Sequence, residues 1–133
     1  MNYLNAEQVL FIHARLIAET GGAHGVRELG LLLSAVARPQ VTFDGQDLYP
    51  DLFSKAAALL ESLVGKHAFL DGNKRTAITS AGLFLPINGY RLTASNQEFE
   101  TFTLQCAQSL VSMDQITQWF KNNSERVPSP YHK

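Results

Sequence analysis

Apolar residues recur at intervals of three and four along much of this chain, which is the spacing of one face of an α-helix. The first such stretch follows Asn5 and Gln8, a pair typical of a capping box, and ends before Gly21-Gly22. The second ends before Pro39, because proline cannot continue a helix. The apolar positions are Val9, Ile12, Leu16 and Ile17 in the first stretch, and Leu29, Leu32, Leu33 and Val36 in the second. Both stretches are predicted to be amphipathic helices.

The clearest helical pattern begins after Pro50 and ends at Gly65, and another begins near Asn73. Their apolar positions are Phe53, Ala56, Leu60, Leu63 and Val64, and then Ala77, Ile78, Ala81, Phe84 and Leu85. The apolar surface of the later helix is broad, which predicts a central place in the fold. We expect Pro86 to kink or end that helix, and Asn88-Gly89 to stop it shortly afterwards.

Two further helices are predicted towards the C-terminus, over Asn96–Leu110 and Met113–Asn122, the second behind a Ser112/Gln115 capping box. Their apolar faces carry Phe99, Phe102 and Cys106, and then Ile116, Trp119 and Phe120. Between the central and C-terminal helices, residues 90–93 are expected to form a short extended piece. The tail at residues 128–133 is expected to be disordered.

The helical period is lost between Pro39 and Pro50. Val41, Thr42 and Phe43 form a strand-like run, and the Asp44-Gly45 dipeptide after it suits a tight hairpin turn because glycine tolerates a positive φ. We therefore expect a loop or a short β-flap here. The whole pattern predicts an all-α fold, a bundle of about six helices with one short β-flap, in a single domain over residues 1–127.

Composition and charge narrow the classes of function. The sequence has 133 residues, 45% of them hydrophobic, which suits one compact domain with its own core. Eleven basic against twelve acidic residues give a formal net charge of -1, so a broad basic surface and direct nucleic-acid binding are not expected. A single cysteine, no apolar run of about 18 residues and no signal-like start indicate a soluble, cytoplasmic protein without membrane contact.

Residues capable of chemistry are concentrated between the two strongest helices. Residues 67–77, here called the motif, read His-Ala-Phe-Leu-Asp-Gly-Asn-Lys-Arg-Thr-Ala. His67 suits a general base that accepts the proton of an attacking hydroxyl, and Asp71 suits a hard oxygen ligand for Mg²⁺. The side chain of Phe69 is expected to pack in the core, which anchors this loop and fixes the direction of His67. These residue types suit phosphoryl or nucleotidyl transfer.

The second half of the motif suits phosphate binding. The N–H groups in the first turn of a helix lack intrahelical partners and attract anions, whereas Lys74 and Arg75 in that turn are unfavourable for the helix itself. A bound phosphate explains these two cations. Gly72 lets the backbone approach a phosphate, and Asn73 can cap the helix and donate to an anion. The alternative for each residue alone is an ordinary polar turn with solvated side chains.

The order of the motif resembles the signature of the Fic/Doc superfamily, and specifically of its Doc (death-on-curing) branch. The matching signature is His67-x-Phe69-x-Asp71-Gly72-Asn73-Lys74-Arg75. Further similar stretches are Leu32–Pro39, Tyr49–Phe53 with Lys55–Ala57, and Phe84-Leu85 with Asn88–Tyr90, so the resemblance covers residues 5–120. It implies a Fic-like helical fold.

Two departures from the common Fic signature bear on the reaction. Most Fic proteins transfer the AMP of ATP to a target hydroxyl, and their signature has glycine at the position of Lys74 and arginine at that of Ile78. A long cation and an apolar side chain at these positions disfavour the same nucleotide orientation. The Doc branch shares both changes. The resemblance therefore implies a kinase that binds ATP the other way round, passes its γ-phosphoryl group to a threonine of elongation factor Tu, and stops translation.

The resemblance also implies roles and partners. It makes His67 the general base and Asp71 the Mg²⁺ ligand, with Gly72, Asn73, Lys74 and Arg75 at the phosphates and Arg75 also stabilising the transition state. In Fic-type proteins a hairpin beside the motif aligns the target by strand addition, which gives this role to Val41, Thr42 and Phe43, although a plain surface loop is the alternative. An AMP transferase and a catalytically silent binding module stay open as alternative functions.

Control is expected from a second protein. Self-inhibited Fic proteins carry the pattern Ser/Thr-x-x-x-Glu-Gly/Asn, and no glutamate of this sequence stands in it. The resemblance thus implies an antitoxin in trans, similar to the Phd type, whose disordered C-terminal part folds onto the toxin. Outside the motif, His13 is expected to be a partly buried residue of the first helix, and Cys106 to pack in the core.

Overall fold

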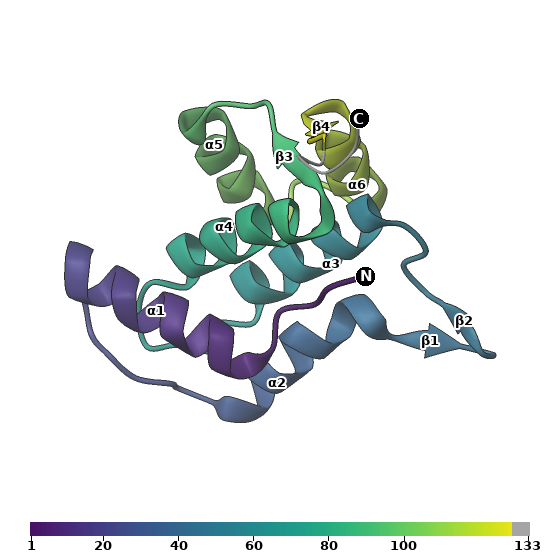
Figure 1. Ribbon diagram of the computed structural model, residues 1–133. Coiled ribbons are helices and arrows are strands. Elements are labelled where there is room, and N and C mark those ends of the chain that lie inside the picture. Colours follow the sequence, from purple (N-terminus) through teal and green to yellow (C-terminus); the bar gives the residue numbers. More distant parts are fainter. Residues whose placement is uncertain (129–133) are drawn as a thin grey trace.

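Figure 1 shows a computed structural model of the chain, which describes residues 1–128. Within these residues six α-helices are joined by short connections. They are α1 (Ala6–Thr20), α2 (Leu29–Ala37), α3 (Leu52–Gly65), α4 (Asn73–Phe84), α5 (Asn96–Ala107) and α6 (Met113–Asn122). The all-α prediction is confirmed. Of the tail predicted to be disordered, residues 129–133 lie outside the described residues.

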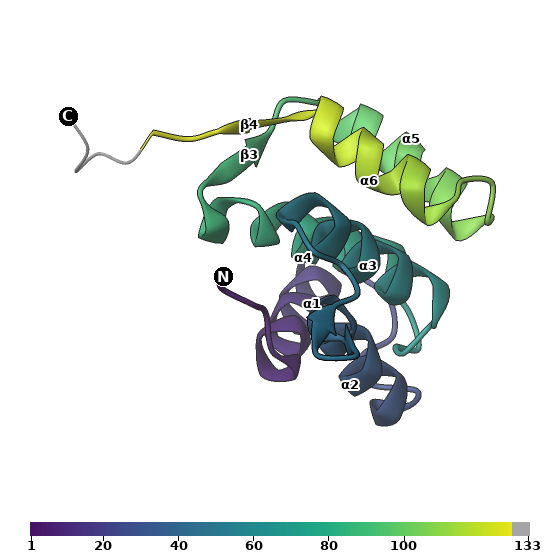
Figure 2. The ribbon, with the colours of Figure 1, turned by 90° about the vertical axis from the view of Figure 1, so that its right-hand side faces the viewer.

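Helices α3 and α4 form the centre of the molecule. Figure 2 shows α5 and α6 on one side of this pair and α1 and α2 on the other. Buried side chains occupy 10 positions of the 14-residue helix α3, which explains why its sequence pattern is so strongly apolar. The motif joins α3 to α4, so it is attached at both ends to the core. No helix of residues 1–128 is long and apolar enough to cross a membrane.

The helix ends follow local signals in the sequence. The predicted capping boxes at Asn5 and Ser112 are present. Pro86 ends α4 instead of kinking it, and the chain continues as a single 3-10 turn, η2 (Pro86–Asn88). Helix α5 ends at Ala107, three residues before the predicted end, because Ser109 adopts a left-handed φ of 57°.

Two short antiparallel ribbons complete the fold. The predicted hairpin is present as β1 (Thr42–Phe43) and β2 (Gln46–Asp47), with positive φ at both turn residues, Asp44 and Gly45. The extended piece β3 (Tyr90–Leu92) is also present, and it pairs with β4 (Ser124–Arg126). The sequence did not predict β4, because three polar residues carry no alternation of apolar and polar positions.

A buried lysine holds the base of the hairpin. Lys55 on α3 is 2% exposed, and its Nζ donates to the main-chain oxygen of Pro39 and to Asp47 Oδ2, both at 3.1 Å. Pro39 lies in the 3-10 turn η1 (Arg38–Gln40), just before the hairpin. A buried cation is costly unless it is paired and hydrogen-bonded, so these contacts fix the hairpin against the first turn of α3.

Candidate active site

The motif side chains surround one cleft at the start of α4. This motif cleft has a volume of about 490 Å³. It is lined by His67, Leu70, Asp71, Gly72, Asn73, Lys74, Arg75 and Glu100. The structure therefore brings together the six motif residues that the sequence predicted as a site, and it adds Glu100 from α5, which the sequence did not single out.

A stack of two buried rings fixes the loop before α4, residues 66–72, here called the motif loop. Phe69 is 2% exposed, and its ring lies against the imidazole of His13 with 3.8 Å between ring centroids and an interplanar angle of 7°. His13 Nε2 also donates to the main-chain oxygen of Asp71 at 2.8 Å. His13 is thus more than a packing residue of α1. Sequence reasoning missed this role because helical spacing alone does not reveal it.

Asn73 closes the motif loop on itself. Its Oδ1 accepts a hydrogen bond from the N–H of Phe69, and its Nδ2 donates to the oxygen of the same residue, both at 3.0 Å. The expectation that Asn73 caps α4 is wrong, because the N-cap residue is Gly72, in a left-handed conformation with φ of 76° and no side-chain cap. The amide of Asn73 therefore stabilises the shape of the loop.

The residues that lie beside the motif loop come from the connection between α1 and α2. This connecting segment, residues 21–28, is exposed and pairs with the loop by main-chain hydrogen bonds. Arg27 N donates to Ala68 O at 2.8 Å, and Leu70 N donates to Gly25 O at 3.1 Å. The two bonds flank an antiparallel bridge between Val26 and Phe69. No pattern in the sequence indicated this pairing, because a Gly-rich segment lacks the alternation of apolar and polar residues that is typical of a strand.

The predicted β-flap lies elsewhere. The hairpin that carries Val41, Thr42 and Phe43 precedes the first turn of α3, whereas the motif follows the last turn of the same helix. A helix of 14 residues is about 21 Å long, and Figure 1 shows the hairpin projecting away from the motif loop. The expectation of a hairpin beside the motif is therefore corrected. The interposed helix keeps the two apart.

The carboxylate of Asp71 lies in the lining of the cleft and accepts fewer hydrogen bonds than it could. Its Oδ1 accepts from Gly72 N at 2.9 Å and its Oδ2 from Ala23 N at 3.3 Å. A Cβ on Gly22, whose φ is 113°, would stand 2.5 Å from Oδ2, so only glycine fits here. An ionised carboxylate has about four acceptor sites, which leaves lone pairs free for a cation. No group of three or more His, Cys, Asp or Glu residues suited to a metal occurs in the described part.

The two cations of the motif have protein partners. Lys74 Nζ lies 3.4 Å from Glu100 Oε1, across the cleft. Arg75 donates to Thr20 Oγ1 and to the main-chain oxygen of Gly21, at the C-terminal end of α1. A cation is favourable there because the helix dipole is negative at that end. The positions of Lys74 and Arg75 in the first turn of α4 are therefore partly explained by contacts within the protein.

The backbone at the start of α4 has free hydrogen-bond donors. Among residues 1–128, the N–H groups of Asn73, Lys74 and Arg75 have no acceptor, whereas Thr76 N donates to Gly72 O. These donors belong to residues that line the motif cleft. Free N–H donors together with cationic side chains are the chemistry that suits a phosphate group.

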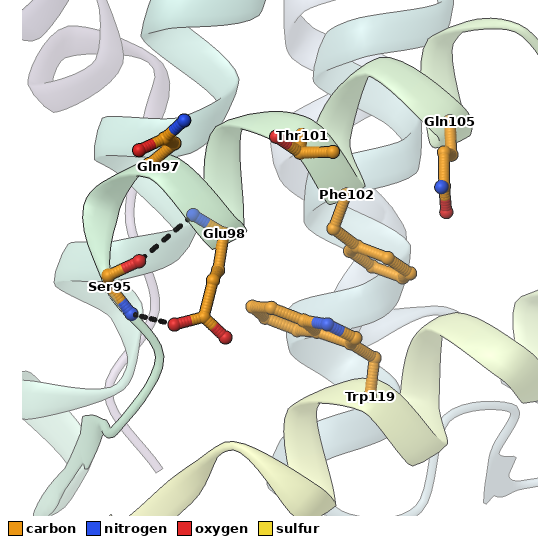
Figure 3. Close-up of a pocket in the computed structure, with 7 residues that line it drawn as sticks. All are labelled: Ser95, Gln97, Glu98, Thr101, Phe102, Gln105 and Trp119. Atoms are coloured by element: carbon orange, nitrogen blue, oxygen red, sulfur yellow. Dashed lines mark hydrogen bonds between the residues drawn. The ribbon is translucent and has the colours of Figure 1, made fainter.

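A second pocket, between α5 and α6, is lined by no lysine or arginine of residues 1–128. It has a volume of about 530 Å³, and Figure 3 shows Trp119 and Phe102 stacked at one side of it, with 4.5 Å between ring centroids. The one charged residue among those that line it is Glu98, whose carboxylate accepts from the N–H of Ser95 in a capping box. This pocket therefore does not suit a phosphate.

The prediction that Cys106 packs in the core is confirmed. The side chain is buried on α5. Burial raises the pKa of the Cys106 thiol to about 12, so that the thiol stays protonated near neutral pH. Cys106 is therefore not a nucleophile.

Comparison with known proteins matches the chain to one family. A family model described as the Fic/DOC family matches residues 3–85. The chain is 56% identical over 92 residues to a protein named Toxin Doc from Mycolicibacterium smegmatis, which covers 69% of this chain and 68% of that protein. It is 30% identical over 116 residues to Protein kinase doc of Escherichia phage P1, which covers 87% of this chain and 90% of that protein. The resemblance stated from the motif is confirmed.

Replacing His13 tests its role in fixing the motif loop. His13→Ala removes a buried ring stack and a hydrogen bond, and is expected to lower the free energy of unfolding by about 2–4 kcal/mol in denaturant titrations. His24→Ala is the matched control, because His24 is exposed and its loss should change stability by less than about 0.5 kcal/mol. Equal stability of the two variants would contradict the proposed role of His13.

Proposed function

The chain belongs to the Fic/DOC family, and we propose that it is a Doc-like toxin that transfers the γ-phosphoryl group of ATP to a protein hydroxyl. The observation that carries the proposal is the convergence of His67, Asp71 and the free N–H groups of α4 on one cleft. The proposed acceptor is a threonine of a translation protein such as elongation factor Tu. Its modification would inhibit translation.

The proposed reaction uses His67 as the general base. The imidazole of His67 takes the proton of the target hydroxyl while the hydroxyl oxygen attacks the γ-phosphorus. The bond between that phosphorus and the β–γ bridging oxygen breaks, and ADP leaves with the electron pair. His67 is exposed and lines the cleft, so a hydroxyl on another protein can reach it. This step requires the γ-phosphate to lie next to His67.

Asp71 would hold the Mg²⁺ ion that accompanies ATP. Its carboxylate lies in the cleft and has free lone pairs beyond the two that accept N–H groups. Mg²⁺ is commonly bound by one or two carboxylates together with substrate phosphates and water, so Asp71 could serve as its one carboxylate ligand while Glu100 stays paired with Lys74 or free. When bound, the ion neutralises charge on the phosphate oxygens.

The phosphates would bind at the first turn of α4. The N–H groups of residues 73–75 would donate to phosphate oxygens, and the side chains of Lys74 and Arg75 would supply positive charge. Lys74 must exchange Glu100 for a phosphate. That exchange costs little, since the ion pair is accessible to solvent, with 34% of the Lys74 side chain and 57% of the Glu100 side chain exposed. Arg75 has five donors, so it can keep its contacts with α1 and still reach the cleft.

The side chains at positions 74 and 78 favour transfer of the γ-phosphoryl group over transfer of AMP. Fic proteins that transfer AMP have glycine and arginine where this chain has Lys74 and Ile78. Ile78 is partly buried against the core and has no donor for a phosphate. AMP transfer on the same scaffold is the second candidate function. It would break the bond between the α-phosphorus and the α–β bridging oxygen, and would release pyrophosphate.

The free edge of the connecting segment is the proposed docking place of the target. Because the bonds of Gly25 and Arg27 point to the motif loop, the N–H and C=O groups of Val26 between them point away from it. Neither group has a partner among residues 1–128. An extended target segment could add to this edge as a strand, which would place its hydroxyl beside the motif.

An antitoxin in trans is the proposed source of control. The relative from Mycolicibacterium smegmatis is named a toxin, and the sequence of this chain lacks the glutamate pattern of self-inhibited Fic proteins. We propose a cytoplasmic toxin with a Phd-like partner that folds onto it.

Transfer of separately labelled phosphates tests the reaction. With elongation factor Tu as acceptor, label from [γ-³²P]ATP is expected in the protein and label from [α-³²P]ATP is not. His67→Ala should lower the transfer rate by at least about 100-fold, because the general base is lost. The free energy of unfolding should stay unchanged. Transfer of α-label would show an AMP transferase, and transfer of neither label to elongation factor Tu would refute that acceptor.

Two single variants test whether the target docks on the connecting segment or on the hairpin. Val26→Pro removes the outward N–H and fills the edge, and is expected to raise the KM for the target about five- to tenfold without changing the KM for ATP. Phe43→Ser on the distant hairpin, where the ring is 72% exposed, should leave both constants unchanged. If Phe43→Ser raised the KM for the target and Val26→Pro did not, the target would dock on the hairpin instead.

A further inference from the structure

His67 has a backbone conformation that needs support. Its φ is 52°, in the left-handed region, where residues other than glycine are strained by about 1–2 kcal/mol. Its side chain is exposed, so packing around the imidazole does not hold the residue in place. Something else must keep the main chain in this shape if His67 is to point in one direction.

One residue of the connecting segment binds three consecutive carbonyl groups around His67. Arg27 Nε donates to His67 O at 2.7 Å, and one of its terminal nitrogens, Nη2, donates to Lys66 O at 3.2 Å. The main-chain N–H of the same arginine donates to Ala68 O at 2.8 Å. The side chain is therefore engaged with the motif loop, and its contact with Glu28 is looser, with 3.9 Å between Nη1 and Oε2.

The geometry of a guanidinium group suits this task. Its donors form a rigid, planar fork, so two of them can meet two neighbouring carbonyl oxygens at a fixed angle. A lysine ammonium is a point charge on a flexible stem and cannot define that angle in the same way. Arg27 is not among the residues that line the motif cleft, so it has no direct contact with a substrate there.

We propose that Arg27 is a positioning residue, which holds the main chain of His67 in its left-handed conformation and thereby directs the imidazole towards the reacting hydroxyl. The catalytic part of this inference rests on the proposed function. Its effect should be on the chemical step and not on ATP binding, because the N–H groups and cations at the start of α4 do not contact Arg27.

The test compares Arg27→Met, Arg27→Lys and a control, Arg15→Met. Arg27→Met is expected to lower kcat for phosphoryl transfer to elongation factor Tu about tenfold, with the KM for ATP within about twofold of the parent. The kcat of Arg27→Lys should lie between that of Arg27→Met and that of the parent. Arg15 pairs with Glu19 on the exposed side of α1, so Arg15→Met removes the same charge without touching the motif loop, and should behave as the parent.

A second measurement does not depend on activity. The Cα and Cβ chemical shifts of His67 report its backbone conformation, and they are expected to move away from the left-handed range in Arg27→Met but not in Arg15→Met. Unchanged shifts would overturn the inference, as would shifts that move while kcat stays the same, or a raised KM for ATP at constant kcat. If the parent transferred no phosphoryl group, the proposed function would fail, and the shifts would still decide whether Arg27 holds His67.

Discussion

The candidate site depends on the attachment of the motif loop to α1 and to the segment that follows it. The ring of Phe69 is clamped against His13, and the loop main chain is paired on its outer side with the connecting segment. Without these contacts a loop that carries exposed residues such as His67 and Asp71 would be mobile. With them, the carboxylate of Asp71 and the imidazole of His67 are presented from one defined main-chain path. Residues far apart in the sequence thus form a single unit of structure.

The electrostatics of the cleft follow from the same arrangement. The first turn of α4 offers unpaired N–H groups, and two cations follow directly, which would repel one another and the helix dipole in isolation. Glu100 and the C-terminal end of α1 offset that repulsion. The cleft can therefore exist in a folded protein before an anion arrives. An incoming phosphate needs to displace only an exposed ion pair.

The sequence was a good guide to the helices and to the residues of the motif, but a poor guide to what surrounds the motif. Periodicity and capping pairs are local signals, so α1 and α6 were predicted within a residue or two of their ends. The contacts of His13 and Arg27 join positions more than 30 residues apart, and no local pattern encodes them. The hairpin was predicted correctly as a hairpin, yet its distance from the motif depends on the length and direction of α3.

The central claim is that the start of α4 binds the phosphates of ATP with the γ-phosphate next to His67. The most direct measurement is a crystal structure of the protein with Mg²⁺ and a non-hydrolysable ATP analogue. We expect the terminal phosphates to accept hydrogen bonds from the N–H groups of residues 73–75, with Lys74 turned from Glu100 towards them. An α-phosphate beside His67, or a nucleotide bound outside the motif cleft, would contradict the account.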